Sequence, residues 1–278
     1  PKNVAEIPQH AFNSCSKLAN ITMPDTVKSI GSYAFAGCTA LTEAVLPAEL
    51  ETTGERIFNG CKNITEITLP KKMEIISAGM LAGMTGLKTV IIPDGVTEIA
   101  ANAFRECSSI ETIELPDSII AIGSAAFYDC KSLKNITLPS GMTEISSELF
   151  RNCTALESLD IPGGITKIGN AAFYQCTSLT AAEIPENVTA IENWAFGNCS
   201  SLASCTLNDG VESIGEGAFA SCKALTEFIM PDSVTKIGGA VFEFCTALEN
   251  VKLSENITSL PQRNHGAYGY YHNGTFEG

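Results

Sequence analysis

Apolar and polar residues along the chain follow one pattern that returns every 23 residues. In an early copy, apolar Ile21 and Met23 alternate with polar Asn20 and Thr22, which is typical of a strand with one buried face. Pro24 is expected to end this strand, because proline has no N–H to donate to a neighbouring strand. The pattern therefore predicts one short strand in each copy.

The second half of the same copy predicts a turn followed by a short helix. Gly31 permits a tight reversal of the chain. Ala34, Phe35, Cys38 and Leu41 then fall at the spacing of residues on one face of a helix. We expect one or two helical turns here before the next strand begins.

Single residue types keep this register along nearly the whole chain. Cysteine recurs at Cys15, Cys38, Cys61, Cys107, Cys130, Cys153, Cys176, Cys199, Cys222 and Cys245. Phenylalanine recurs at Phe12, Phe35, Phe58, Phe104, Phe127, Phe150, Phe173, Phe196, Phe219 and Phe242. Met84 and Leu81 stand at the two skipped positions, and chance cannot hold several residue types in one register for so long.

One copy has no second layer that could bury its apolar residues, so neighbouring copies must cover one another. The pattern predicts an α/β solenoid, a right-handed coil of about twelve repeats with one parallel β-sheet and one short strand and helical turn per repeat. The solenoid is expected to span residues 1–260. Residues 261–278, which are polar and rich in glycine and tyrosine, are expected to be a tail or the remnant of a cap.

The repeating unit can be written LxxIxLPxxVxxIGxxAFxxC, and "LKNITLPSGMTEISSELFRNC" at 133–153 is one close copy. It resembles the BspA-like leucine-rich repeat of bacterial surface proteins. The resemblance covers residues 1 to about 260. It implies an extracellular or cell-surface protein with a role in adhesion or host interaction, whose signal and anchor we expect to lie outside this chain. It identifies no ligand and no functional residue.

Composition narrows the choice of partner. The chain carries 31 acidic and 17 basic residues, a formal net charge of -14. Proteins that bind nucleic acid or anionic lipid need lysine and arginine to neutralise phosphates, so neither is expected as a partner. No apolar run approaches the roughly 20 residues that span a bilayer, and we expect no membrane insertion by this segment.

The sequence offers little to catalysis or to metal binding. The cysteines form no CxxC pair and only three histidines are present, so we expect no metal and no other cofactor. A small hydrophobic residue in the core is the simplest role for the cysteine column, and Met84 at a column position supports it, since a thioether cannot form a disulfide. No catalytic motif is present, and we expect that the chain is not an enzyme.

Two sets of variable positions are candidate binding residues. The first is an acidic cluster at strand positions that point away from the core, and it could recognise a cationic patch on a partner or be only a solvated face. It consists of Glu111, Glu114, Glu157, Asp160 and Glu183.

The second set follows the phenylalanine column in four successive copies, where arginine and tyrosine alternate at Arg105, Tyr128, Arg151 and Tyr174. This alternation suits cation–π contacts, either as structural stacking or as an exposed contact patch. The sequence as a whole predicts a non-catalytic interaction module that binds a protein, with a host extracellular protein as the candidate partner. A carbohydrate-binding scaffold with a glycan partner is the alternative, but the strand face lacks the aromatic residues that stack on sugars.

Overall fold

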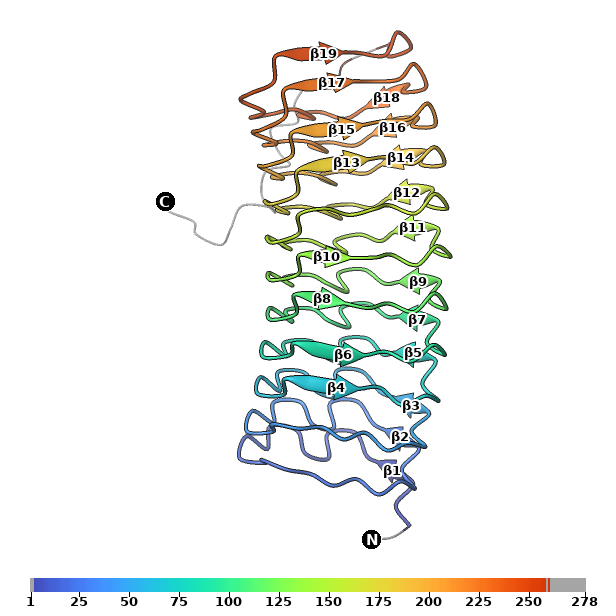
Figure 1. Cartoon of the computed structure of the whole chain (residues 1–278), viewed down its shortest axis with the longest axis vertical. Coiled ribbons are helices and arrows are strands. Elements are labelled where there is room, and N and C mark those ends of the chain that lie inside the picture. Colours follow the sequence, from blue (N-terminus) through green and yellow to red (C-terminus); the bar gives the residue numbers. More distant parts are fainter. Residues whose placement is uncertain (1–2, 259, 261–278) are drawn as a thin grey trace.

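The computed structural model describes residues 3–258 and 260, which form a parallel β-solenoid of about eleven turns. The turns lie one above another along a single axis, with the N-terminal turn at one end and β19 at the other (Figure 1). Paired strands are offset by one repeat, as in Glu66↔Thr89 and Glu144↔Lys167. The predicted stacking of 23-residue copies is therefore confirmed.

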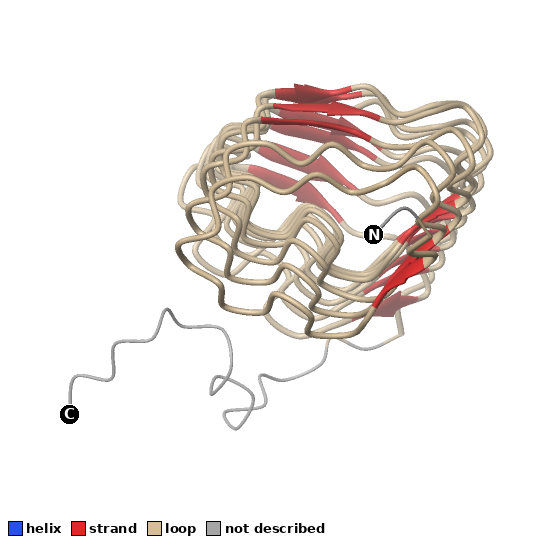
Figure 2. Ribbon diagram, turned by 90° about the horizontal axis from the view of Figure 1, so that it is seen from below, coloured by secondary structure: helices blue, strands red, loops and turns tan. Residues whose placement is uncertain are grey.

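Strands occur on two sides of most turns, in two columns that Figure 1 labels and that the end-on view in Figure 2 separates. The first column, here called the LxxIxL face, contains β4 (Glu66–Thr68), β6 (Thr89–Ile91), β8 (Thr112–Ile113), β10 (Asn135–Ile136), β13 (Ala181–Glu183), β15 (Ser204–Thr206), β17 (Glu227–Ile229) and β19 (Asn250–Lys252). Its strands pair in twos, β4 with β6, β8 with β10, β13 with β15 and β17 with β19.

The second column, here called the VxxI face, is more continuous. It contains β1 (Glu6–Ile7), β2 (Ser29–Ile30), β3 (Thr52–Thr53), β5 (Ile75–Ile76), β7 (Glu98–Ile99), β9 (Ala121–Ile122), β11 (Glu144–Ile145), β12 (Lys167–Ile168), β14 (Ala190–Ile191), β16 (Ser213–Ile214) and β18 (Lys236–Ile237). These strands form parallel sheets of three, three and five members. The prediction of a single sheet with one strand per repeat is therefore wrong, because the VxxI segment of the repeat also forms a strand.

The predicted helical turn is also wrong, since no helix occurs in the described residues. Backbone hydrogen bonds explain why. The N–H of Phe35 donates to the carbonyl of Ile57 in the next turn at 2.9 Å, whereas the N–H of Ala34 donates to Gly31 in its own turn at 3.2 Å. Alternate N–H groups thus point along the solenoid axis, which an α-helix does not allow.

Left-handed residues interrupt the same segment twice in most turns. They lie two positions before and two positions after the phenylalanine column, as at Tyr33 (φ 58°) and Gly37 (φ 72°), or Ala125 (φ 55°) and Asp129 (φ 59°). A right-handed helix cannot contain such residues. The spacing of Ala34, Phe35, Cys38 and Leu41 reflects burial in a series of tight turns.

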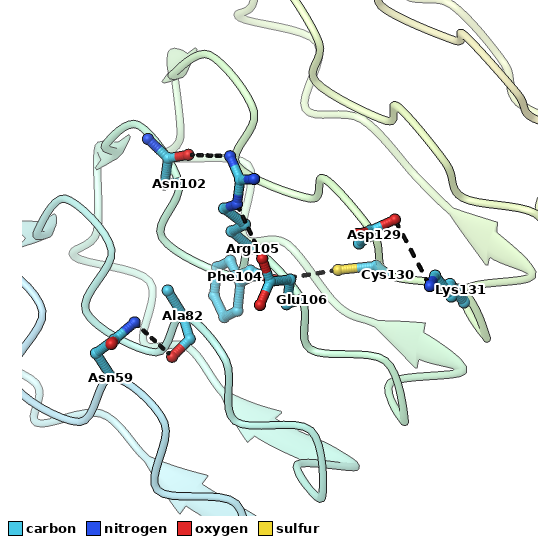
Figure 3. Close-up of polar contacts among 9 residues, drawn as sticks. All are labelled: Asn59, Ala82, Asn102, Phe104, Arg105, Glu106, Asp129, Cys130 and Lys131. Atoms are coloured by element: carbon cyan, nitrogen blue, oxygen red, sulfur yellow. Dashed lines mark hydrogen bonds and ion pairs between the residues drawn. The ribbon is translucent and has the colours of Figure 1, made fainter. Parts of the chain in front are cut away.

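The core consists of the apolar columns. Phe104, Phe127 and Phe150 are fully buried, and their rings stack nearly parallel with centroids 5.2 and 5.7 Å apart. Leu81 interrupts this stack at one turn. The column cysteines from Cys38 to Cys222 are buried, and each thiol donates to a backbone carbonyl of the preceding turn, as Cys130 does to Phe104 at 3.2 Å (Figure 3).

Candidate interaction surfaces

All five acids of the predicted cluster are exposed on the LxxIxL face. They occupy two different columns of that face. One column comes directly after the first apolar residue of the LxxIxL pattern, and the other lies between its last two apolar residues. The first column holds Glu111 and Glu157, and the second holds Glu114, Asp160 and Glu183. The two columns differ in how far their charges are compensated.

Glu111 and Glu157 lie on either side of Lys134. Backbone hydrogen bonds from Lys134 to Glu111 (2.9 Å) and from Glu157 to Lys134 (3.1 Å) fix the three residues in register on successive turns. The Lys134 Nζ donates to Glu111 Oε2 at 2.8 Å, and this hydrogen bond holds the pKa of the Glu111 carboxyl below its usual value. Glu111 is therefore already partnered, and its exposed pair contributes little to stability.

Glu114, Asp160 and Glu183 are different, because no ion pair involving them occurs among residues 3–258. Asp160 and Glu183 lie on adjacent turns of the same face, and both are exposed. A cationic group of a partner would meet carboxylates there that no described lysine or arginine already neutralises. These three carboxylates form the uncompensated part of the acidic face.

Exposed isoleucines flank the three carboxylates in the same column, and the sequence analysis missed them. Ile91 is 49% exposed and Ile229 is 52% exposed. Most other turns carry threonine or an acid at this position, so an apolar residue on the solvent side of a strand was the available signal. The two isoleucines would add apolar contact area at the ends of this column if a partner covered the face.

The structure brings the arginine–tyrosine column together as the sequence suggested. The Arg105 guanidinium lies 4.1 Å from the centroid of the Tyr128 ring, and Arg151 lies 5.5 Å from the same ring and 5.0 Å from Tyr174. Trp194 extends the column, with its ring 6.2 Å from Tyr174 in an edge-to-face arrangement. Arg105 is also held by Asn102 and Glu106 (Figure 3).

Burial limits what this column can offer to a ligand. Tyr174 is only 4% exposed, and 16% of the Arg151 side chain is accessible. Arginines of the preceding and following turns cover the Tyr128 ring, so neither of its faces is free. Trp194 in turn lies against Gly217, where a Cβ would meet the indole at 2.8 Å. This geometry fits stacking within the solenoid better than an open contact patch.

A hollow near the N-terminal end was not foreseen from the sequence. It has a volume of about 1030 Å³ and lies between residues 42–49 and residues 65–72, on the LxxIxL face. Its lining includes Glu43, Val45, Glu66 and Thr68. The ion pair between Lys72 and Glu49, at 2.6 Å, lies at its edge and holds the pKa of Glu49 below its usual value. Only the exposed Val45, at a position that is usually polar, hinted at it.

The buried cysteine thiols of the core have low reactivity. Burial raises the pKa of the Cys61 and Cys199 thiols to about 12, and it also raises that of Cys107. A thiol with such a pKa is a poor nucleophile and a poor metal ligand near neutral pH. No group of three or more potential metal ligands occurs in the described residues. The same residues contain no helix, and therefore none that is long and apolar enough to cross a membrane.

A parallel β-solenoid built on LxxIxL turns defines a leucine-rich-repeat protein. The chain belongs to the BspA-type leucine-rich-repeat family, whose model matches residues 1–111, 97–198 and 166–265. No curated protein matches it.

Several solved structures share the fold. A leucine-rich repeat protein from Bacteroides ovatus is 32% identical with a TM-score of 0.80, over 92% of this chain and 72% of that one. A leucine rich cell surface protein from Faecalibacterium prausnitzii is 26% identical with a TM-score of 0.60, over 90% of this chain and 76% of that one. The pneumococcal vaccine antigen PcpA, at 22% identity and a TM-score of 0.53 over 87% and 64% of the two chains, shares the fold alone.

Proposed function

We propose that the chain is a non-catalytic interaction module of a secreted or cell-surface protein, and that its LxxIxL face recognises a cationic patch on a protein partner. The observation that carries the proposal is the column of uncompensated carboxylates at Glu114, Asp160 and Glu183, flanked by exposed Ile91 and Ile229. The charges would steer the partner, and the isoleucines would contribute apolar contact area once it has docked.

The family supports a binding role, since the repeated residues build a scaffold and the variable residues lie on its surface. The surface location is drawn from the name of the F. prausnitzii relative, a cell surface protein at 26% identity. Adhesion to a host protein is the role that we favour within this proposal, since a rigid stack of parallel strands presents its side chains in fixed register.

A glycan-binding scaffold is the second candidate, and the aromatic column weakens it. Sugar rings stack on free aromatic faces, but Tyr128 is covered on both sides and Tyr174 is buried. Trp194 is half-buried against Gly217. A protein partner therefore fits the exposed side chains better than a carbohydrate does.

The test compares a panel of purified extracellular proteins with a glycan array, first using the native chain. The strongest protein binder is then measured against a triple variant with Glu114→Lys, Asp160→Lys and Glu183→Lys. We expect at least about tenfold weaker binding, as for other charge-complementary interfaces. A carbohydrate that binds the native chain while no protein does would overturn the proposal.

A matched control reverses three exposed acids on the other sheet, with Glu6→Lys, Glu98→Lys and Glu212→Lys. It changes the net charge by the same amount but leaves the LxxIxL face intact. Circular dichroism checks that both variants fold. Equal losses in the two variants would mean that overall charge, and not the proposed face, determines binding.

A further inference from the structure

Residues 42–46 are an extended segment of the LxxIxL face that pairs with neither neighbouring turn. Buried Ala44 and Leu46 alternate with exposed Glu43 and Val45, as in a strand with one inner face. Yet no backbone hydrogen bond joins these five residues to another turn, although both of their neighbours lie within the described part of the chain. By contrast, β4 in the next turn pairs fully with β6.

Hollows border this segment along both of its edges. The hollow of about 1030 Å³ separates it from β4 and from the turn that follows β4. A smaller one of about 280 Å³, lined by Asn20, Ile21 and Thr22, separates it from the preceding turn. Backbone N–H and C=O groups in such a place must be satisfied by water or by a ligand. The segment therefore has the properties of an open strand edge inside a groove.

The side chains around the larger hollow define what would fit there. Glu43 on one wall and Glu66 on the other are exposed and have no ion pair among residues 3–258. The third acid of the lining, Glu49, is already engaged by Lys72 at 2.6 Å. Two residues further along the same walls, Val45 is 63% exposed and Thr68 is exposed.

A strand lying in this groove would place alternate side chains between these pairs. A residue between Glu43 and Glu66 faces two free carboxylates, which favours lysine. The next residue on the same face lies between Val45 and Thr68, which favours a β-branched aliphatic side chain. The residue between them faces the level of Ala44 and must be small.

We propose that this groove binds an extended peptide of a protein partner by strand addition, with a lysine–small–β-branched motif, and with its backbone paired to residues 42–46. Strand addition draws affinity from main-chain hydrogen bonds and specificity from alternate side chains. The site lies apart from Glu114, Asp160 and Glu183. Its test therefore has an outcome independent of the proposed function.

The probe is the synthetic blocked heptapeptide Val-Thr-Lys-Ala-Val-Thr-Val, added to the full chain. Binding is followed by calorimetry, and amide hydrogen exchange locates it. We expect slower exchange at 42–46 and in β4. A peptide with proline in place of the central alanine should bind at least about tenfold more weakly, because it lacks a backbone donor. A peptide with glutamate in place of lysine should lose a similar amount through charge repulsion.

The protein variant Glu43→Lys with Glu66→Lys should bind the peptide at least about tenfold more weakly. The double variant Glu98→Lys with Glu212→Lys makes the same charge change on the VxxI face and should keep the native affinity.

Three results would overturn the proposal: no binding at millimolar peptide, equal binding of the proline peptide, or protection that maps away from residues 42–46. If the groove variant does not fold, the proline peptide and the exchange map on the native chain still decide. Binding of a glycan in the same groove, without amide protection, would also contradict strand addition.

Discussion

The buried thiols predict that the solenoid unfolds in mildly alkaline solution. Nine thiols have a pKa raised above the usual 9.0, eight of them chiefly by burial and Cys222 chiefly by its hydrogen bond with Cys245. The nine are Cys38, Cys61, Cys107, Cys130, Cys153, Cys176, Cys199, Cys205 and Cys222. The folded state keeps these protons while the unfolded state releases them. The free energy of unfolding should thus be nearly unaffected by the thiols below about pH 8 and fall from there to about pH 12.

The size of the effect follows from the number of thiols. At pH 10, each thiol that ionises only in the unfolded state lowers the free energy of unfolding by about 1.4 kcal/mol. Cys222 is left out of the sum because its hydrogen bond with Cys245 lowers the pKa of that thiol and so acts in the opposite direction. The other eight groups give a loss on the order of 10 kcal/mol, which is comparable with the whole stability of many proteins. The urea midpoint, followed by circular dichroism, should therefore change little below pH 8, begin to fall between pH 8 and pH 9, and fall most steeply from pH 9 to pH 10.

A variant with Cys130→Ala, Cys153→Ala and Cys176→Ala is the matched test. It should start from a lower stability because of the cavities, but its loss between pH 9 and pH 10 should be smaller by about a third. A midpoint that stays constant up to pH 10, or an equal pH slope in the variant, would refute the assignment of a protonated, buried cysteine column.

Three further predictions concern packing and backbone. Phe127→Ala should lower the free energy of unfolding by about 3–5 kcal/mol in denaturant titration, because it empties one position of the ring stack. Gly217→Ala should lower the free energy of unfolding by about 1–3 kcal/mol and shift the fluorescence of Trp194, the single tryptophan, because residue 217 has φ 60° and a Cβ there meets the indole. The control Gly163→Ala has open space around its Cβ and should change neither the stability nor the fluorescence. Phe244→Gly should stabilise the chain by about 0.5–1 kcal/mol in the same titration, because Phe244 has a left-handed backbone conformation that is unfavourable for a bulky residue, and its exposed ring loses little packing when removed. A loss of stability in this variant would contradict the reasoning.

The register of the solenoid could be predicted because burial alone determines it. Residues such as Phe127 and Cys130 recur every 23 positions, and only stacked copies can bury them all. The helical turn was predicted wrongly because burial at three- and four-residue spacing is equally compatible with successive tight turns. Glycine would have signalled the left-handed positions, but Glu106 and Gln175 occupy them in some turns. The hydrogen bonds between turns satisfy the backbone there.

The candidate site was predictable to the same extent. Sequence register placed Glu114, Asp160 and Glu183 on one exposed column, because strand alternation decides which way a side chain points. It could not show that Tyr174 is buried, since that depends on Trp194 packing onto glycines of its own and the next turn. Nor could it show the groove beside residues 42–46, because unpaired strand edges leave no mark in the hydrophobic pattern.

The central claim is that the acidic LxxIxL face makes the contact with a protein partner. The most direct measurement is the association rate constant with the selected binder, taken over a series of salt concentrations. The native chain and the triple variant at Glu6, Glu98 and Glu212 should associate at similar rates, and both rates should fall roughly tenfold from low to high salt. The triple variant at Glu114, Asp160 and Glu183 should associate slowly at every salt concentration. If it matches the native chain in both rate and salt dependence, the contact lies elsewhere on the solenoid.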